Sequence, residues 1–184
     1  MQASEPSITG VRHQVWLTIL VAATIGFSLV FACAAPFAAF GAIAALTLSR
    51  RDALLVTVAL WLANQLTGYA LLGYPGTANS VAWGPAIGTA AVLGTIAAQW
   101  TVLRLAGARD VVRAPAALLA AFAVYEVAIF VVSLALLGGI EMFAPAIVGQ
   151  VFVTNMAALA GLYGLNRLGV ALGFRRRSAV RISA

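Results

Sequence analysis

The side chain with the clearest potential for chemistry is the carboxyl of Glu126, which lies inside the long apolar run 115–137. At about 1.5 Å per residue along a helix, Glu126 lies roughly 16 Å from the Gly138 end of that run. If the run crosses a bilayer, an ionisable group at this depth is costly and is a candidate for binding a ligand or a proton. The alternative is a structural carboxyl that is protonated or paired with an amide.

Amide side chains lie at comparable depths in other apolar runs. Asn155 matches the depth of Glu126, and Gln150 lies nearer the same surface. Asn64 and Gln65 lie a little below the corresponding end of an earlier run. If these helix faces converge, the amides form a polar pocket that can both donate and accept hydrogen bonds. The alternative is that each amide only bonds to a neighbouring helix.

Aromatic side chains lie close to these polar groups. Tyr74 and Trp83 could stack on a flat ligand, although an interfacial aromatic belt would place them in the same positions. Tyr125 directly precedes Glu126, and Asn79 lies in a loop near Trp83. The predicted substrate-binding residues are therefore Asn64, Gln65, Tyr74, Asn79, Trp83, Tyr125, Glu126, Gln150 and Asn155.

Residue patterns typical of enzymes are missing from the sequence. It has no His/Glu metal pair, no GxSxG motif, no phosphate-binding glycine loop and no paired carboxylates among its five acids. Cys33 and His13 are the single thiol and the single imidazole, and they lie at opposite ends of the first apolar run, whereas a structural metal site takes four close ligands. We expect no enzymatic activity, no metal and no cofactor.

The composition indicates an integral membrane protein. Hydrophobic residues make up 63% of the chain, only 9% are charged, and the mean hydropathy is +1.02. A soluble domain has roughly 25% charged residues. A membrane-spanning helix needs about 20 apolar residues, so 184 residues allow six or seven spans and no large soluble domain.

Six apolar runs can be distinguished, and they predict an all-α membrane protein. The chain divides into an N-terminal tail at 1–14, a six-helix membrane domain at 15–170 and a basic tail at 171–184. The runs are 15–35, 37–48, 53–72, 81–103, 115–137 and 145–170.

All eleven basic residues are arginine, and they occur in every second loop. They precede the first run, separate the second from the third and the fourth from the fifth, and follow the sixth. The positive-inside rule then predicts six spans with both termini in the cytoplasm, as a multi-pass protein of the bacterial inner membrane. Arginines at the ends of apolar runs favour a bilayer over nucleic acid as the partner.

One alternative concerns the N-terminal segment. Arg12, the apolar stretch and the small residues 32–34 resemble a signal peptide with a cleavage site, which would remove residues 1–34. Such cleavage would not disturb the alternation of the remaining arginines.

Small residues recur at four-residue spacing in two of the runs, and they predict close packing between helices inside the protein. A surface that binds a partner is the alternative. These residues are Ala90, Gly94 and Ala98 in one run, and Ala157 with Gly161 and Ala160 with Gly164 in the other.

The whole pattern resembles the substrate-binding S-components of energy-coupling factor vitamin transporters. The similarity lies in length, six spans, cytoplasmic ends and an alanine-rich first run that breaks at Pro36 before Phe-Ala-Ala-Phe-Gly at 37–41. The loop 73–83 falls where that family has a ligand-gating loop.

The resemblance implies a mechanism and partners. Substrate would bind among the outer ends of the last three helices, and the subunit would topple in the membrane beside a transmembrane coupling subunit and two ATPases. A small-residue motif on helix one contacts the coupling subunit in that family, and its nearest equivalent here is Ala22 with Gly26. Some cobalamin-binding members work without a dedicated coupling module and use a loop cysteine as a cobalt ligand. Loop 73–83 has no cysteine or histidine.

We therefore expect a membrane-embedded subunit that binds a vitamin or related small molecule for uptake. The outer loops lack arginine, which argues against a strongly anionic ligand and favours a cobalamin-like or other largely neutral, polar one. The alternatives are a structural or assembly subunit of a larger membrane complex and a membrane-embedded enzyme.

Overall fold

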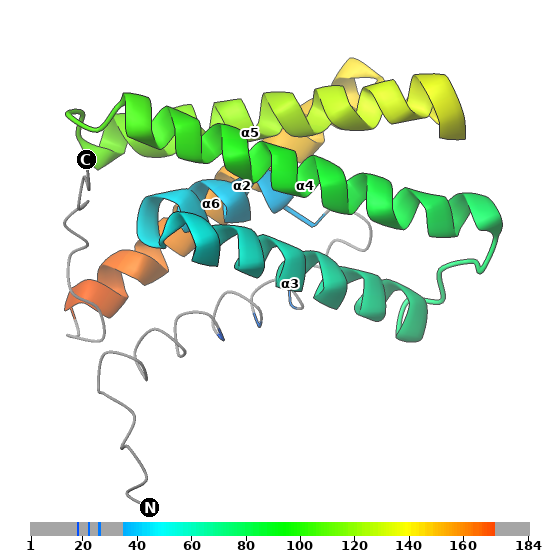
Figure 1. The fold of residues 1–184 in the computed structure, drawn as a ribbon, viewed down its shortest axis with the longest axis horizontal. Helices are drawn as coiled ribbons and strands as arrows, with labels where there is room; N and C mark the ends of the chain where they lie inside the picture. The colour runs from blue at the N-terminus through cyan, green and yellow to red at the C-terminus, as the bar shows by residue number, and fades with distance from the viewer. Residues whose placement is uncertain (1–17, 19–21, 23–25, 27–34, 172–184) are drawn as a thin grey trace, which may run out of the picture.

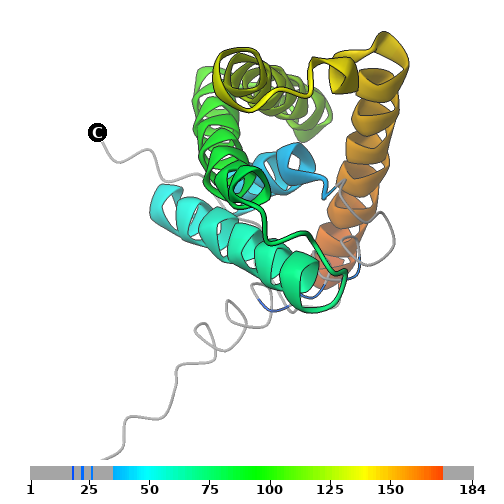
Figure 2. The same cartoon turned by 90° about the vertical axis from the view of Figure 1, so that its right-hand side faces the viewer.

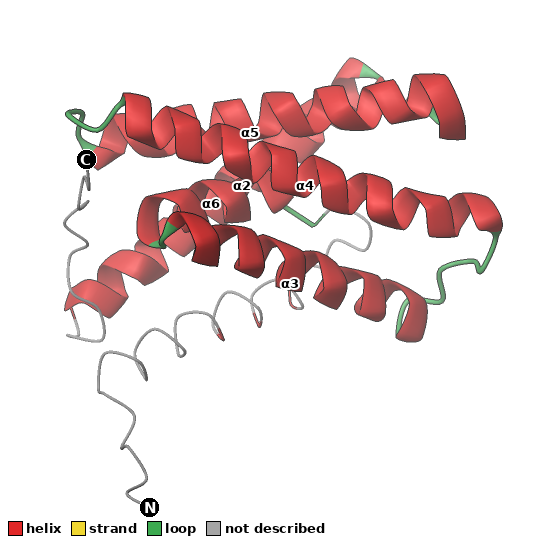
Figure 3. Cartoon of the chain, viewed as in Figure 1, coloured by secondary structure: helices red, strands yellow, loops and turns green. Residues whose placement is uncertain are grey.

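The computed structural model describes residues 18, 22, 26 and 35–171, and every element in this part of the chain is helical (Figures 1 and 3). The predicted all-α class is confirmed. The elements are α2 (Phe37–Thr47), α3 (Arg50–Ala70), α4 (Ala78–Arg104), α5 (Asp110–Val132), a π-helical turn η1 (Ser133–Leu137), a 3₁₀ turn η2 (Ile140–Phe143) and α6 (Pro145–Ala171).

The helix ends follow from local side-chain chemistry. Ser49 precedes α3, where its hydroxyl accepts a hydrogen bond from the backbone N–H of Asp52 at 3.2 Å. Thr77 caps α4 in the same way. Gly138 and Gly139 have φ angles of 74° and 89°, which side chains with a Cβ rarely adopt, and so they end the α5–η1 segment as the sequence predicts.

Within the described residues, four helical segments are long and apolar enough to cross a bilayer. They are α3 with 21 residues, and α4, the segment Asp110–Leu136 of α5 and η1, and α6 with 27 residues each. Their outward faces carry large apolar side chains, such as Leu66, Val111 and Leu136, which are 69%, 74% and 79% exposed. Such a surface suits lipid and not water, so the chain is a multi-pass membrane protein.

The second predicted span has a different role from the other four. It forms α2, which has 11 residues and is therefore about 16 Å long, roughly half the thickness of the hydrocarbon core. In Figure 2, α2 lies in the middle of the four long helices, and it contacts all of them. By itself α2 does not cross a membrane. The tails 1–14 and 172–184 lie outside the described residues, and so does the first predicted span apart from residues 18, 22, 26 and 35.

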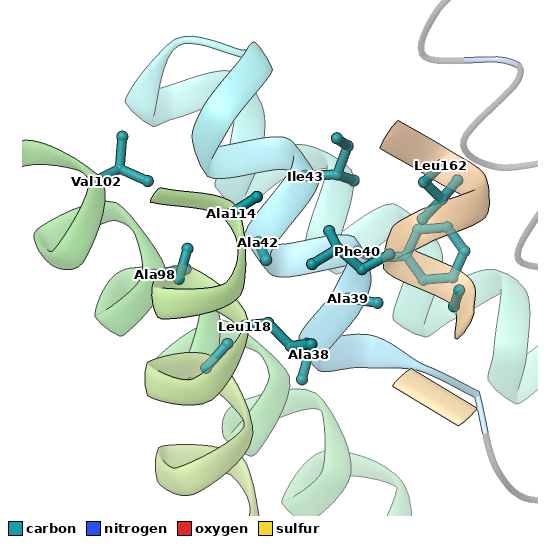
Figure 4. Close-up of a cluster of buried hydrophobic side chains, with 14 of the residues drawn as sticks. Ala38, Ala39, Phe40, Ala42, Ile43, Ala98, Val102, Ala114, Leu118 and Leu162 are labelled. Atoms are coloured by element: carbon teal, nitrogen blue, oxygen red, sulfur yellow. The ribbon is translucent and has the colours of Figure 1, made fainter. Parts of the chain in front are cut away.

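The core is built around α2 and consists largely of alanine. Side chains of α2, α4, α5 and α6 meet there (Figure 4). Helices α2 and α4 come close together where Gly41 faces Thr95, and α4 and α5 where Gly94 faces the backbone of Ala121. Internal packing is thus confirmed for the small residues of α4. On α6 it stays a prediction, because Ala157, Ala160, Gly161 and Gly164 are exposed and no other described residue packs closely over them.

The two ends of the bundle differ in charge. We call the end formed by the start of α3, the α4–α5 loop and the end of α6 the basic end, because every described arginine lies near it (Figure 1). We call the opposite end the loop end. Two boundaries were predicted wrongly. Helix α5 starts at Asp110, inside the stretch expected to be a loop, and α4 starts at Ala78, which shortens the expected loop 73–83.

Candidate functional site

A cavity of about 610 Å³ lies in the loop-end half of the bundle, above the N-terminus of α2. The first residues of α2, the loop-end halves of α4, α5 and α6, and the turn η2 form its walls. Its volume falls in the range of roughly 300–1,000 Å³ found for small-molecule sites. The polar or amphipathic side chains that line it are Trp83, Tyr125, Glu126, Gln150, Thr154 and Asn155.

Five of the nine predicted binding residues therefore lie together around one cavity. They come from three helices, and their positions agree with the depths counted from the sequence. The remaining walls are apolar and were missed, because hydropathy does not distinguish an apolar side chain that faces a cavity from one that faces lipid. These missed residues include Phe37, Ile87, Ile129, Met142, Phe143 and Ile147.

Aromatic rings form part of the cavity wall. Phe37 of α2 stacks on Tyr125 of α5, with ring centroids 6.2 Å apart and an interplanar angle of 29°. Trp83 of α4 lines the same cavity. Aromatic rings in such walls offer flat apolar surface for stacking on a ligand.

Glu126 is the single charged side chain among the described residues that line the cavity. Within residues 35–171 its carboxyl has neither a hydrogen bond nor an ion pair, since the one ion pair found there joins Arg113 to Asp110 at the basic end. The indole N–H of Trp83, the hydroxyl of Tyr125 and the side-chain amide of Gln150 also have no hydrogen-bond partner in that range. Four groups that can form hydrogen bonds thus remain available to a molecule in the cavity.

Asn155 differs from these four because its amide is already engaged. Its Oδ1 accepts a hydrogen bond from the backbone N–H of Ala39 at 3.0 Å, and its Nδ2 donates to the carbonyl of Val151 at 2.9 Å. The side chain is buried. Asn155 therefore joins the first turn of α2 to α6 and fixes the floor of the cavity.

The other four predicted binding residues lie outside the cavity. Asn64 is buried in α3, and the Oε1 of Gln65 lies against Gly84 of α4. Tyr74 packs edge-on against Tyr69, with centroids 5.8 Å apart. These contacts join α3, its following loop and α4, and the remaining member, Asn79, is exposed at the start of α4.

The predicted docking residues Ala22 and Gly26 are both helical and exposed. Because they are four residues apart, they share one face of a helix. Thr18 is also helical and exposed and lies on the same face.

A second hollow, of about 810 Å³, lies between the loop-end halves of α4 and α5. Its lining is almost entirely apolar and includes Pro85, Leu93, Val127 and Leu136. Several of these side chains are exposed on the outward face, where lipid chains are the expected neighbours. This groove offers no charged group to hold a polar ligand.

Comparisons with known proteins add no family to this description. No protein-family model matches the chain, and neither a curated protein nor a solved structure matches it significantly. A functional interpretation therefore rests on the cavity and on the unpaired polar groups around it.

Proposed function

We propose that the chain is the membrane-embedded substrate-binding subunit of an uptake system for a vitamin or related small molecule, of the energy-coupling factor type. The observation that carries this proposal is the group of four unpaired polar side chains around the 610 Å³ cavity. Inside a membrane protein an unpaired polar group is costly, so such groups normally find partners within the chain. Trp83, Tyr125 and Glu126 are half-buried, and Gln150 is exposed beside them. Three partly buried groups without partners around one cavity favour a partner that comes from outside the chain.

The orientation that we propose places the basic end in the cytoplasm and the cavity toward the outside of a bacterial inner membrane. The arginines at the basic end support it. The proposal includes six hydrophobic segments, with run 15–35 preceding α2 and both termini in the cytoplasm. A substrate would then enter from the loop end.

The subunit that we propose binds its substrate and performs no chemistry on it. Energy for uptake would come from a transmembrane coupling subunit and two ATPases, with Ala22 and Gly26 as docking residues. Their exposure on one helix face supports this role. The cavity volume suits a compact, drug-sized ligand, so a ligand as large as cobalamin is no longer part of the proposal.

The test is to identify the molecule that the protein retains. The full chain is purified in lipid nanodiscs, and small molecules are extracted and identified by mass spectrometry. We expect one compound in stoichiometric amounts with the wild type and at least about tenfold less with Trp83→Ala, because loss of a buried aromatic contact costs more than about 1.4 kcal/mol of binding free energy.

Trp100→Ala is the matched control. Trp100 lies on the same helix, but it is 54% exposed near the basic end and contacts Arg104. It should leave the retained compound unchanged. If no compound is retained by the wild type, or if both variants retain it equally, the proposed function is wrong.

A structural or assembly subunit of a larger membrane complex is the second candidate. The exposed small residues of α6 favour it, because small residues let another helix approach closely. Gly161→Leu would then release partner proteins during purification and leave any bound small molecule in place. Under the first proposal, Trp83→Ala would instead release the bound small molecule and leave any partner proteins in place.

A further inference from the structure

We infer that the cavity selects an organic cation, that is, a compact molecule with a protonated or quaternary amine next to a flat or aliphatic apolar body. This inference rests on the proposed function and specifies its ligand class. It follows from the charge of the cavity, from its aromatic walls and from the charge of the whole loop end.

The first argument is the unpaired charge inside the cavity. Among the described residues, Glu126 contributes the one ionisable carboxyl of the walls, and no arginine lies near enough to pair with it. The Glu126 side chain is half-buried. A partly desolvated charge without a partner is costly, and a cationic ligand supplies that partner together with hydrogen-bond donors. A neutral ligand would leave the carboxylate unpaired, and an anionic ligand would meet a like charge.

The second argument is the aromatic surface beside that carboxyl. Trp83, Tyr125, Phe37 and Phe143 all line the cavity. The faces of such rings attract a cation placed within about 6 Å of the ring centre, and Trp is the strongest of them. A carboxylate next to several aromatic rings is therefore suited to an alkylated ammonium group, which is weakly hydrated and can enter an apolar cavity.

The third argument concerns the whole loop end. Within residues 35–171 it carries two carboxyl groups, Glu126 and Glu141, and no basic side chain. All described arginines lie near the other end. The loop end therefore has a negative potential that would attract cations toward the cavity and repel anions.

The N-termini of α2 and α6 are positive poles near the cavity, and their donors are largely occupied. In α6 the N–H groups of Ile147 and Val148 both bond to the carbonyl of Ala144. The same holds for α2. The N–H of Phe37 bonds to the carbonyl of Ala35, and that of Phe40 bonds to the carbonyl of Pro36. The N–H of Ala39 bonds to Asn155. These helix ends therefore do not present an open set of donors for an anionic group.

Three probes with one aromatic body and different charges test the inference. They are benzyltrimethylammonium, benzyl alcohol and benzoate. Binding to the full chain in nanodiscs of zwitterionic lipid is measured by equilibrium dialysis, and empty nanodiscs of the same lipid correct for partitioning. We expect the cation to bind at least about tenfold more tightly than the alcohol, and benzoate to show no specific binding.

Glu126→Gln removes the charge and keeps the shape, so it should abolish the preference for the cation. Glu141→Gln is the matched control, because Glu141 is the other carboxyl of the loop end but is exposed and does not line the cavity. It should keep the preference. Equal binding of the three probes, or a cation preference that survives Glu126→Gln, would overturn the inference.

These outcomes are separate from those of the proposed function. If a compound is retained in a Trp83-dependent way but the cation is not preferred, the proposed function still holds. Only the proposed ligand class is then contradicted. Absence of any retained compound would contradict the proposed function itself.

Discussion

A single amide, that of Asn155, decides where the floor of the cavity lies. It accepts the N–H of Ala39 on one side and donates to Val151 on the other. The first turn of a helix has N–H groups that lack partners within the helix, and inside a membrane no water reaches them. Asn155 satisfies one of these groups from a residue more than one hundred positions away in the sequence.

Replacing Asn155 by alanine should therefore destabilise the fold. The buried N–H of Ala39 would lose its acceptor, which costs about 1–3 kcal/mol. For a protein of this size, that corresponds to a fall in melting temperature of roughly 2–12 °C. The measurement is thermal unfolding of the purified chain in detergent.

Thr154→Val provides the control on the neighbouring residue. Its hydroxyl donates to Gln150 within α6, so its loss breaks no link between helices and should change the melting temperature little. If Asn155→Ala proved as stable as the wild type, the hydrogen bond to Ala39 would not be what fixes α2.

For single residues, the depth along a helix could be predicted from the sequence, but the side of the helix on which the side chain lies could not. Glu126, Gln150 and Trp83 lie around the cavity, as their distances from the helix ends predict. Asn64 and Gln65 have suitable depths too, but α3 directs them toward other contacts. A count of residues gives height along a helix, whereas rotation about its axis depends on tertiary packing that depth and residue type did not reveal.

At the scale of elements, the unusual part is a short helix enclosed by four long ones. All residues of α2 from Phe37 to Ala44 are buried. Its small side chains allow the long helices to approach it closely, most of all where Gly41 faces Thr95. The cavity exists because α2 begins part-way along the bundle and leaves space above its first turn.

Gly41→Ala should destabilise this arrangement. A Cβ at position 41 would lie 2.7 Å from Oγ1 and 3.3 Å from Cα of Thr95, so α2 and α4 would have to separate. Overpacking of this kind costs about 1–3 kcal/mol. Thermal unfolding in detergent again measures the effect.

Gly164→Ala is the matched substitution in α6, where no described atom lies within 4 Å of the new Cβ. Alanine favours the helix over glycine by roughly 0.5–1 kcal/mol, so this variant should be as stable as the wild type or more so. If Gly41→Ala were equally well tolerated, the close approach of α2 and α4 would be without energetic importance.

The sequence predicted that 37–48 would form an apolar helix but not that this helix would lie in the centre. Its hydropathy is similar for a buried helix and for one that faces lipid. Run 37–48 is the shortest of the six, and this was the one feature of the sequence that could have indicated a different role. Gly138 and Gly139, in contrast, marked the end of the α5–η1 segment well because glycines act locally.

At the scale of the whole molecule, the two ends differ in both charge and shape. The alternation of arginines along the chain predicted that they would gather at one end, and the antiparallel order of α3 to α6 brings the described ones together there (Figure 1). The cavity lies toward the other end. Charge and cavity together give the molecule two unlike ends, and this difference supports the orientation that we propose.

Labelling of single cysteines tests this orientation. In a Cys33→Ser background, Gly76→Cys places a thiol in the loop before α4, and Gly107→Cys places one in the loop after it. Both glycines are exposed, with no described side chain close by. We expect a membrane-impermeant thiol reagent to label position 76 in intact cells. It should label position 107 only after the cells are permeabilised. The reverse pattern would place the cavity on the cytoplasmic side.

The most direct test of the central claim is to locate the bound molecule in an experimental structure. The full chain, purified with the compound that it retains and held in a nanodisc, is suited to electron cryo-microscopy. The expected result is ligand density between Trp83, Tyr125 and Glu126, with an amine directed toward the carboxyl. Density at another position, or a cavity closed by protein side chains in the presence of the compound, would contradict the account.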